Sequence, residues 1–310
     1  MGRILFIVFY VACVFPVLAG DLEDGRAAID AEDYDTAVNL LLPLAENGNA
    51  DAQSEVGLLY FYGNGVKRDH GVALQWIKKA VDQGHAAAQN NLGLMYREGM
   101  GVTQDYAEAL RLFRLSTEQG YAKAYANLGY MYALGLGVKR DDTEAVRLFR
   151  IAADEGDSSG QYFLGACYAT GQGVEKDYVE SFKWYRISAE QGDPSSQERL
   201  GYMYEQGQSV EQDIDEAMKW YRMAAEQGDQ RAISRLEYLS GMQAMMAPAD
   251  DLAVSYLRVK FIADIIPNPQ GGGTLNIGGE EITSEKAVEY RQKYDKRLKL
   301  YKEAIKYRGY

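Results

Sequence analysis

Histidine and cysteine are scarce in this chain of 310 residues, which contains two of each. Neither His70 nor His85 has a second ligand one helical turn away, so the sequence offers no metal-binding motif. Cys13 lies in the first apolar segment and Cys167 stands alone in the remainder, which excludes an internal disulfide outside that segment. Stability must therefore come from packing. Cys167 shares a repeat position with leucine and methionine, so we expect a buried apolar side chain rather than a reactive thiol.

Catalytic patterns are missing as well. The serines belong to no nucleophile motif, and most carboxylates occupy solvated positions or helix starts. The run Gly271-Gly272-Gly273 lacks the preceding strand and the directly following helix that a phosphate-binding loop requires. We therefore predict no catalytic residue, no metal and no cofactor.

Positive charge is scarce along most of the chain, whose net charge is −12. The exception begins at Ser284, after which nine Lys or Arg accompany four Asp or Glu. An acidic body disfavours nucleic acid and broad adhesion to anionic lipid as partners. The basic end, a predicted helix over Ser284–Tyr307, could pack on the acidic repeats, dock on a partner or lie on a membrane surface. The first use is favoured, and the last is disfavoured because the apolar stripe is mostly tyrosine and alanine.

Long apolar runs are absent except at the beginning. Arg3 precedes the apolar run Ile4–Phe15, and Val17-Leu18-Ala19 supplies the small or apolar residues of a cleavage site. This arrangement is typical of a secretory signal peptide cleaved after Ala19 or one residue later. The run is shorter than the ~20 residues of a membrane-spanning helix, which disfavours a retained anchor. We predict an exported protein, with the bacterial periplasm as the first choice and secretion as the second.

Periodicity is what the sequence has in abundance, because the same residue types recur every 36 positions. Four columns define the period: Gly48, Gly84, Gly120, Gly156, Gly192 and Gly228; Gly57, Gly93, Gly129, Gly165 and Gly201; Tyr60, Tyr96, Tyr132, Tyr168 and Tyr204; Asp69, Asp105, Asp141, Asp177 and Asp213. A period of this length indicates a solenoid, in which each unit completes its core against its neighbours.

Each unit is predicted to contain two amphipathic helices of about three turns, joined by a short turn. Gly63 and Gly65 bracket the turn, Asp69 suits the N-cap of the second helix, and Gly84 ends that helix. Gly57 lies in the middle of the first helix, where glycine is ~1 kcal/mol less favourable than alanine. Its recurrence indicates a close approach, for which the second helix of the same unit is the best candidate.

The last full repeat carries the motif most clearly: Leu200-Gly201, Tyr204, Gly207, Val210, Asp213, Ala217, Trp220-Tyr221, Ala224-Ala225 and Gly228. This pattern resembles the Sel-one-like repeat (SLR) family, a relative of the tetratricopeptide repeats, over roughly Ile29 to Leu239. The resemblance implies an all-α, right-handed α-α superhelix, a solenoid of 36-residue helix pairs with capping helices at both ends. Two features depart from the family. The disulfides of its cysteine-rich secreted members are missing, and Ser209 replaces the second turn glycine.

Four segments are predicted: a signal peptide (1–19), N-terminal capping helices (21–47), the repeat solenoid (48–239) and a C-terminal helical extension with a Gly-rich loop (240–310). Glu237 stands where the mid-helix glycine belongs, so the repeats stop there. Beyond a linker over Gln243–Asp250 we expect a helix over Asp251–Ile266. Pro267–Gly279 is predicted to be a flexible loop or a small hairpin.

The resemblance also implies that the first helices line the concave side of the solenoid. In tetratricopeptide proteins that bind a peptide terminus, asparagines just before the Leu-Gly position contact the ligand backbone, and Asn91 and Asn127 match this place. An amide suits the task because it offers a donor and an acceptor. The predicted partner-binding residues are Asn91, Asn127, Arg97, Lys123, Tyr130, Arg199 and Tyr202. The alternative is that both asparagines are ordinary solvated residues.

Two function classes follow from these observations. The first is an exported, non-catalytic scaffold or regulator that binds a protein or peptide in the concave groove. The second is an envelope-acting hydrolase of the β-lactamase-like type, implied by the resemblance to cysteine-rich SLR proteins that have been linked to penicillin binding or hydrolysis. No residue of this sequence marks the hydrolase, so the scaffold is preferred.

Overall fold

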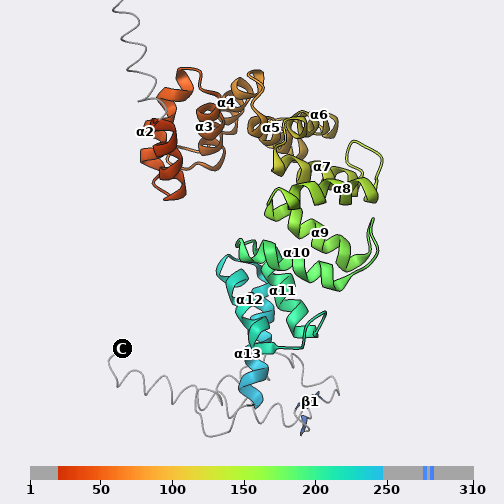
Figure 1. The fold of residues 1–310 in the computed structure, drawn as a ribbon. Coiled ribbons are helices and arrows are strands. Elements are labelled where there is room, and N and C mark those ends of the chain that lie inside the picture. The colour runs from red at the N-terminus through yellow and green to blue at the C-terminus, as the bar shows by residue number, and fades with distance from the viewer. Residues whose placement is uncertain (1–19, 247–274, 278–279, 283–310) are drawn as a thin grey trace, which may run out of the picture. The chain divides into compact units, whose positions relative to one another are not determined.

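The computed structural model describes residues 20–246, 275–277 and 280–282, and its elements are shown in Figure 1. Residues 20–30 form a helix. The helices that follow are α2 (Tyr34–Glu46), α3 (Ala50–Tyr62), α4 (His70–Asp82), α5 (Ala86–Glu98), α6 (Tyr106–Glu118), α7 (Ala122–Leu134), α8 (Asp142–Asp154), α9 (Ser158–Thr170), α10 (Tyr178–Glu190), α11 (Pro194–Gln206), α12 (Ile214–Glu226) and α13 (Gln230–Met246). Strands β1 (Leu275–Ile277) and β2 (Glu280–Ile282) pair antiparallel, with Leu275 opposite Ile282.

The chain divides into two compact units, residues 1–188 and 189–310. In the first unit, α3, α5 and α7 each pack against the helix that follows, and α4, α6 and α8 pack against the first helix of the next repeat. Contacts between α5 and α7 and between α7 and α9 bring first helices of successive repeats side by side. In the second unit α11 packs against α12, and α12 against α13. The predicted all-α solenoid of helix pairs is confirmed.

The repeating aspartates and glycines act at helix ends, as predicted. Asp69 accepts hydrogen bonds from the backbone N–H groups of Gly71 and Val72, which α4 leaves without intrahelical partners. Gly63 ends α3 in the left-handed conformation, with φ +81°. Ser209 adopts φ +66° in the turn position where the earlier repeats have glycine, so this substitution leaves a strained backbone.

The mid-helix glycines lie against the second helix of their own repeat, as predicted. A methyl group on Gly129 would lie 2.7 and 2.8 Å from ring carbons of Phe149 and 3.2 Å from the carbonyl oxygen of Ala145. Both of those residues belong to α8. The backbone of α7 therefore approaches α8 at a distance that only glycine allows.

Buried glutamines link successive helices, a feature that the sequence analysis did not predict. The Nε2 group of Gln53, which is 4% exposed, donates to the carbonyl oxygen of Ala45 at 3.1 Å. Its Oε1 accepts from Gln83 at 2.8 Å. Gln197 makes the corresponding bonds to Ala189 and Gln227 in the second unit. These side chains satisfy carbonyl groups at helix ends that would otherwise be buried without a partner.

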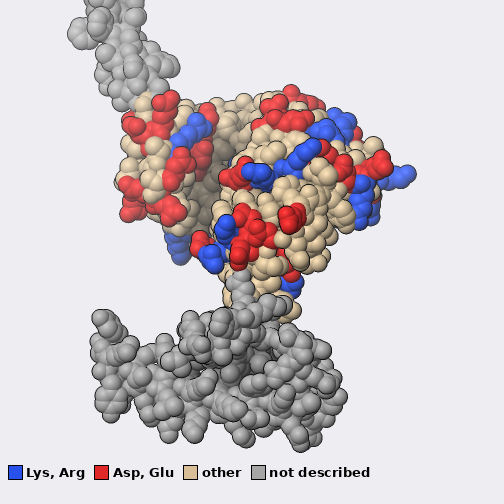
Figure 2. Space-filling model, turned by 60° about the horizontal axis from the view of Figure 1, so that its bottom comes forward, with Lys and Arg blue, Asp and Glu red and all other residues tan. Residues whose placement is uncertain are grey.

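The N-terminal helices carry a dense acidic surface. Glu23, Asp24, Asp30, Asp33 and Asp35 are all exposed. Figure 2 shows a cluster of Asp and Glu at one end of the described part of the chain.

At the other end of the repeats α13 continues to Met246, so the predicted linker over 243–250 begins too early. The described strands, at 275–277 and 280–282, coincide only partly with the segment predicted to be a loop or small hairpin. The predicted helices over 251–266 and 284–307 and the signal peptide lie outside the described residues. Within the described part of the chain, no helix has both the length and the apolarity needed to cross a membrane.

Cys167, His70 and His85, whose side chains are potentially reactive, each contribute to packing or to a helix cap. Cys167 is 8% exposed, and its burial raises the pKa of the thiol to about 11, as expected of an apolar core residue. His70 stacks on Phe61, with ring centroids 4.8 Å apart. The Nδ1 atom of His85 accepts from the backbone N–H of Ala88 and caps α5. Both histidines are partly buried. Among the described residues, no group of three or more His, Cys, Asp or Glu could hold a metal ion.

Candidate functional site

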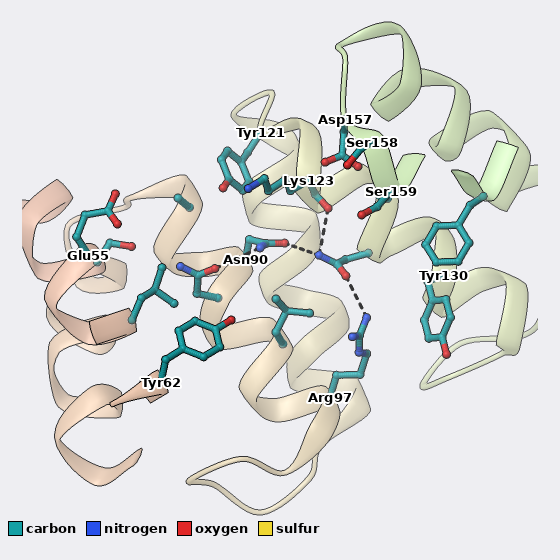
Figure 3. A pocket seen from close by; sticks show the side chains of 18 residues that line it. Glu55, Tyr62, Asn90, Arg97, Tyr121, Lys123, Tyr130, Asp157, Ser158 and Ser159 are labelled. Atoms are coloured by element: carbon teal, nitrogen blue, oxygen red, sulfur yellow. Dashed lines mark hydrogen bonds between the residues drawn. The ribbon is translucent and has the colours of Figure 1, made fainter. Parts of the chain in front are cut away.

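A pocket of about 750 Å³ lies on the first helices of the first unit. Every lining residue belongs to α3, α5, α7 or α9, or immediately precedes one of these helices. None comes from a second helix, so the repeat itself creates the surface by placing equivalent helix faces side by side. Figure 3 shows the lining side chains.

Five of the predicted partner-binding residues line this pocket: Asn91, Arg97, Lys123, Asn127 and Tyr130. The remaining two, Arg199 and Tyr202, lie on α11 in the other compact unit. The structure therefore brings the α5 and α7 residues into one cavity, and that cavity does not include the α11 residues.

Asn127 is the centre of a hydrogen-bond network rather than a free amide. Its Oδ1 accepts from Nη1 of Arg97 at 3.0 Å. Its Nδ2 donates to Oδ1 of Asn90 at 2.9 Å and to the carbonyl oxygen of Lys123 at 3.1 Å. The dashed lines in Figure 3 mark these bonds. Asn90 in turn donates to Oδ1 of Asn91, with Nδ2 and Oδ1 3.4 Å apart.

An aromatic wall stands beside this network. The guanidinium carbon of Arg97 lies 5.1 Å from the ring centroid of Tyr130, within the range of a cation–π contact. Tyr130 is 5.6 Å from Phe163, and Phe163 stacks on the buried Phe149 at 4.9 Å. Because Phe149 also packs on Gly129, the close helix crossing supports the wall from behind. The pocket thus has a rigid aromatic surface next to a fixed cation.

Two carboxylates, those of Glu55 and Asp157, lie on the opposite side of the pocket. Figure 3 shows Tyr121 and Asp157 across the cavity from Arg97. Burial raises the pKa of the Tyr121 hydroxyl, and the charges of Glu55 and Asp157 raise it further. Lys123 lies on the same side and has no carboxylate within 4 Å among the described residues. Glu55 and Asp157 thus lie away from Arg97, whose own carboxylate neighbour is Glu98.

Four further residues contribute to the site and were not predicted. Asn90, which is 2% exposed, holds Asn127 in place. Tyr62, which is 63% exposed, and Phe163 add aromatic surface to the lining. Tyr121 precedes α7 without capping it, whereas Asn, His or Asp caps α3, α5, α9 and α11 at the same position. This break in a capping column was a signal readable in the sequence, and so was the polar residue at the buried position of Asn90.

In the second unit the equivalent helix faces hold an internal ion pair. Arg235 donates both Nε and Nη2 to the carboxylate of Glu205, whose side chain is 6% exposed. The Tyr221 hydroxyl donates to the same carboxylate at 2.9 Å, and its burial and this bond raise its pKa. Glu198, which is 9% exposed, has a raised pKa because burial disfavours its charge. The Glu205 carboxylate is thus satisfied within the protein.

The pocket offers hydrogen-bond donors, one fixed cation and aromatic surface, which are groups suited to recognition. Its lining contains neither histidine nor cysteine. The hydroxyl groups in the lining belong to Ser54, to Ser158 and Ser159 at the start of α9, and to the tyrosines. The arrangement is suited to holding an extended polar segment with an apolar neighbour, rather than to a nucleophilic reaction assisted by histidine.

Comparisons with known proteins agree with the repeat architecture. A family model for the Sel1 repeat matches residues 50–85, 86–121, 122–157, 158–193 and 194–229. A Sel1 repeat protein from Oxalobacter formigenes has a similar crystal structure, with a TM-score of 0.61 and 31% identity over 77% of this chain and 95% of that chain. The protein c5321, described as a protective antigen of uropathogenic Escherichia coli with an SLR fold, gives a TM-score of 0.57 and 31% identity over 93% of this chain and 63% of that chain. No curated protein sequence matches the chain at a significant level.

Proposed function

The chain belongs to the Sel1 repeat family, and we propose that it is an exported scaffold that binds a protein partner through the pocket on α3, α5, α7 and α9. Proteins of this family are generally protein-interaction scaffolds. We expect the bound part of the partner to be an extended peptide segment, because the pocket runs across the first helices of four successive repeats rather than closing around a compact ligand. The role is non-catalytic.

One observation carries the proposal. Side chains from four successive repeats converge on one cavity, and the residue type at these lining positions changes from repeat to repeat. Positions that serve only packing would keep the same residue type in every repeat. At the lining position just before the Leu-Gly pair, the residues are Glu55, Asn91, Asn127 and Phe163. The core columns of the same helices are conserved in type from repeat to repeat. Variation confined to an accessible face is expected where a sequence adapts to a partner and not to its own folding.

Export rests on the N-terminal sequence. A segment with Arg3, an apolar run and a cleavage motif ending at Ala19 is read by the secretory machinery. The repeats need no disulfide, because Cys167 is their single cysteine and is buried. Exposure outside the cytoplasm would also suit a relative of a protein described as a protective antigen. Mass measurement of the mature protein from the periplasmic fraction tests this part; a chain that keeps Met1–Ala19 in the cytoplasm contradicts it.

Site-specific photocrosslinking tests the binding surface. Benzoylphenylalanine replaces Tyr62, an exposed aromatic in the pocket, and in a second variant it replaces Val179, which is 54% exposed on α10 and does not line the pocket. We expect a discrete crosslinked partner from the Tyr62 position and none from Val179. The same partner crosslinked equally from both positions, or from neither, would refute the proposed surface.

A further inference from the structure

The geometry around Arg97 indicates the chemistry of the partner, and this step rests on the function proposed above. Arg97 is held in place without a ligand: Asn127 accepts from its Nη1, and its guanidinium lies over Tyr130. Its Nη2 has no hydrogen-bond partner among the described residues, and its side chain is 17% exposed at the pocket. A guanidinium that is already fixed loses little freedom when it binds a carboxylate, whose two oxygens match its fork of donors.

Asn127 serves Arg97 and is not itself available to a ligand backbone. Both hydrogens of its amide are donated, one to Asn90 and one to the carbonyl of Lys123. Asn90 is 2% exposed and cannot turn away without burying an unsatisfied amide. Contact between Asn127 and a peptide backbone would break this network. We infer that Asn127 is a positioning residue that aims Arg97 and that Arg97 makes the contact.

In the free protein, a carboxylate already binds one nitrogen of the Arg97 guanidinium. Oε1 of Glu98 accepts from Nε of Arg97 at 2.6 Å, and the Glu98 side chain is 47% exposed. Because the Glu98 carboxylate is open to solvent, the pair is screened and can exchange with another anion. We propose that Arg97 receives a carboxylate of an extended peptide, and that Glu98 is the internal competitor for this site in the free protein. The acids Glu55 and Asp157 on the other side of the cavity disfavour a second carboxylate there.

Binding to synthetic peptides tests both statements. The probes are short acetylated peptides that carry one Asp or Glu between Leu and Phe, and the same peptides with Asn or Gln instead. One arm holds the carboxylate inside an amidated peptide, and the other holds it at a free C-terminus; tighter binding in either arm supports the proposal and identifies the source. We expect the acidic peptides to bind at least about tenfold tighter than their amides, because a charged bidentate pair replaces a neutral bond.

Variants then separate the roles. Arg97→Gln should remove the preference for acid over amide because it removes the charge, and Asn127→Ala should weaken the acidic peptides alone, whereas a general loss of structure would weaken both sets. Glu98→Gln should tighten the acidic peptides about two- to fivefold, the range of an exposed ion pair. The matched control is Glu108→Gln, which removes a carboxylate bonded to Arg111 on α6, outside the pocket. It should leave binding unchanged.

The outcomes distinguish the peptide-binding function from the role of Arg97 within it. If the wild type binds none of the peptides, the proposed peptide-binding function fails. If it binds acid and amide equally, the function stands and the assignment of Arg97 to a carboxylate is wrong. Equal gains from Glu98→Gln and Glu108→Gln would show a general charge effect and overturn the competitor role.

Discussion

Gly129→Ala tests the close crossing that supports the aromatic wall of the pocket. The added methyl group would lie 2.7 and 2.8 Å from carbons of the Phe149 ring and 3.2 Å from the Ala145 carbonyl oxygen. Carbon atoms in good contact are ~3.5–4.0 Å apart, so the helices or the ring must move by almost an ångström. Phe149 is 2% exposed and stacks on Phe163, so its ring has no empty space to enter.

Two terms of opposite sign decide the magnitude. Alanine in a helix interior is favoured over glycine by ~1 kcal/mol. Overpacking of a tight core typically destabilises by ~1–3 kcal/mol. We expect the second term to dominate, with a net loss of ~1 kcal/mol in the free energy of unfolding and a fall in Tm of roughly 2–4 °C. Thermal unfolding of the full chain by circular dichroism measures the shift.

The matched control is Gly71→Ala, at an exposed position on α4 where the new methyl group meets only the Asp69 carboxylate, at 3.3 Å. It should be neutral or stabilising by up to ~1 kcal/mol. A second arm combines Gly129→Ala with Phe149→Leu, and the pair should be less destabilising than the sum of the single changes. If Gly129→Ala is as stable as Gly71→Ala, the close approach does not explain this glycine column.

Four further predictions concern single sites. Cys167 should resist iodoacetamide at pH 8 in the native state and react after unfolding, because its pKa is raised to about 11; rapid native labelling would contradict its burial. Ser209→Gly should raise the free energy of unfolding by up to ~1 kcal/mol in urea titrations, because it removes a left-handed non-glycine residue; an unchanged midpoint would show that the turn is unstrained. Glu198 has a raised pKa, so it stabilises the folded state fully below its unfolded pKa of about 4.3 and this contribution is lost as the pH rises through the folded pKa. Glu198→Gln should accordingly raise Tm at pH 7 and lose this advantage near pH 4, and a constant difference would rule out the titration. Arg235→Met should lower the free energy of unfolding by ~2–4 kcal/mol, because it leaves the Glu205 carboxylate buried without its cation. Adding Glu205→Gln to this variant should restore part of the loss. If the losses from the two substitutions simply add, the pair does not contribute as described.

The periodic sequence allowed the fold to be predicted because each repeated residue has one local task. Aspartate at Asp69 caps a helix, glycine at Gly63 ends one, and Gly129 admits a neighbouring helix. These tasks depend on contacts within one repeat or with the next, so a fixed spacing reveals them. The end of α13 was less predictable. Helix ends outside the array have no repeating signal, and α13 is helical through Met246, the last residue described in this segment.

Five of the seven predicted residues lie in the pocket, and the hydrogen bonds that join them were not predicted. Asn91, Arg97 and Asn127 were identified because the repeat register places them on the first helices, and the structure shows that they share one cavity. The bonds of Asn127 to Asn90 and Arg97 could not be foreseen, because they join adjacent repeats through side chains whose rotamers depend on the angle between helices. An asparagine read alone offers a donor and an acceptor; in this packing, both hydrogens of its Nδ2 group are already donated.

The same two repeat positions produce an open site in one unit and a closed one in the other. Arg97 bonds to Asn127 in the first unit, and the equivalent positions hold Glu205 and Arg235 in the second. A neutral amide takes one nitrogen of the guanidinium and leaves Nη2 without a partner among the described residues, whereas a buried carboxylate takes Nε and Nη2 together. The backbone register of the two pairs is the same, but the arginine stands at the first position in one pair and at the second position in the other. The open contact and the closed contact therefore differ at both positions, and the carboxylate binds two nitrogens of the guanidinium where the amide binds one. Function in this chain should accordingly be sought where equivalent positions differ in charge.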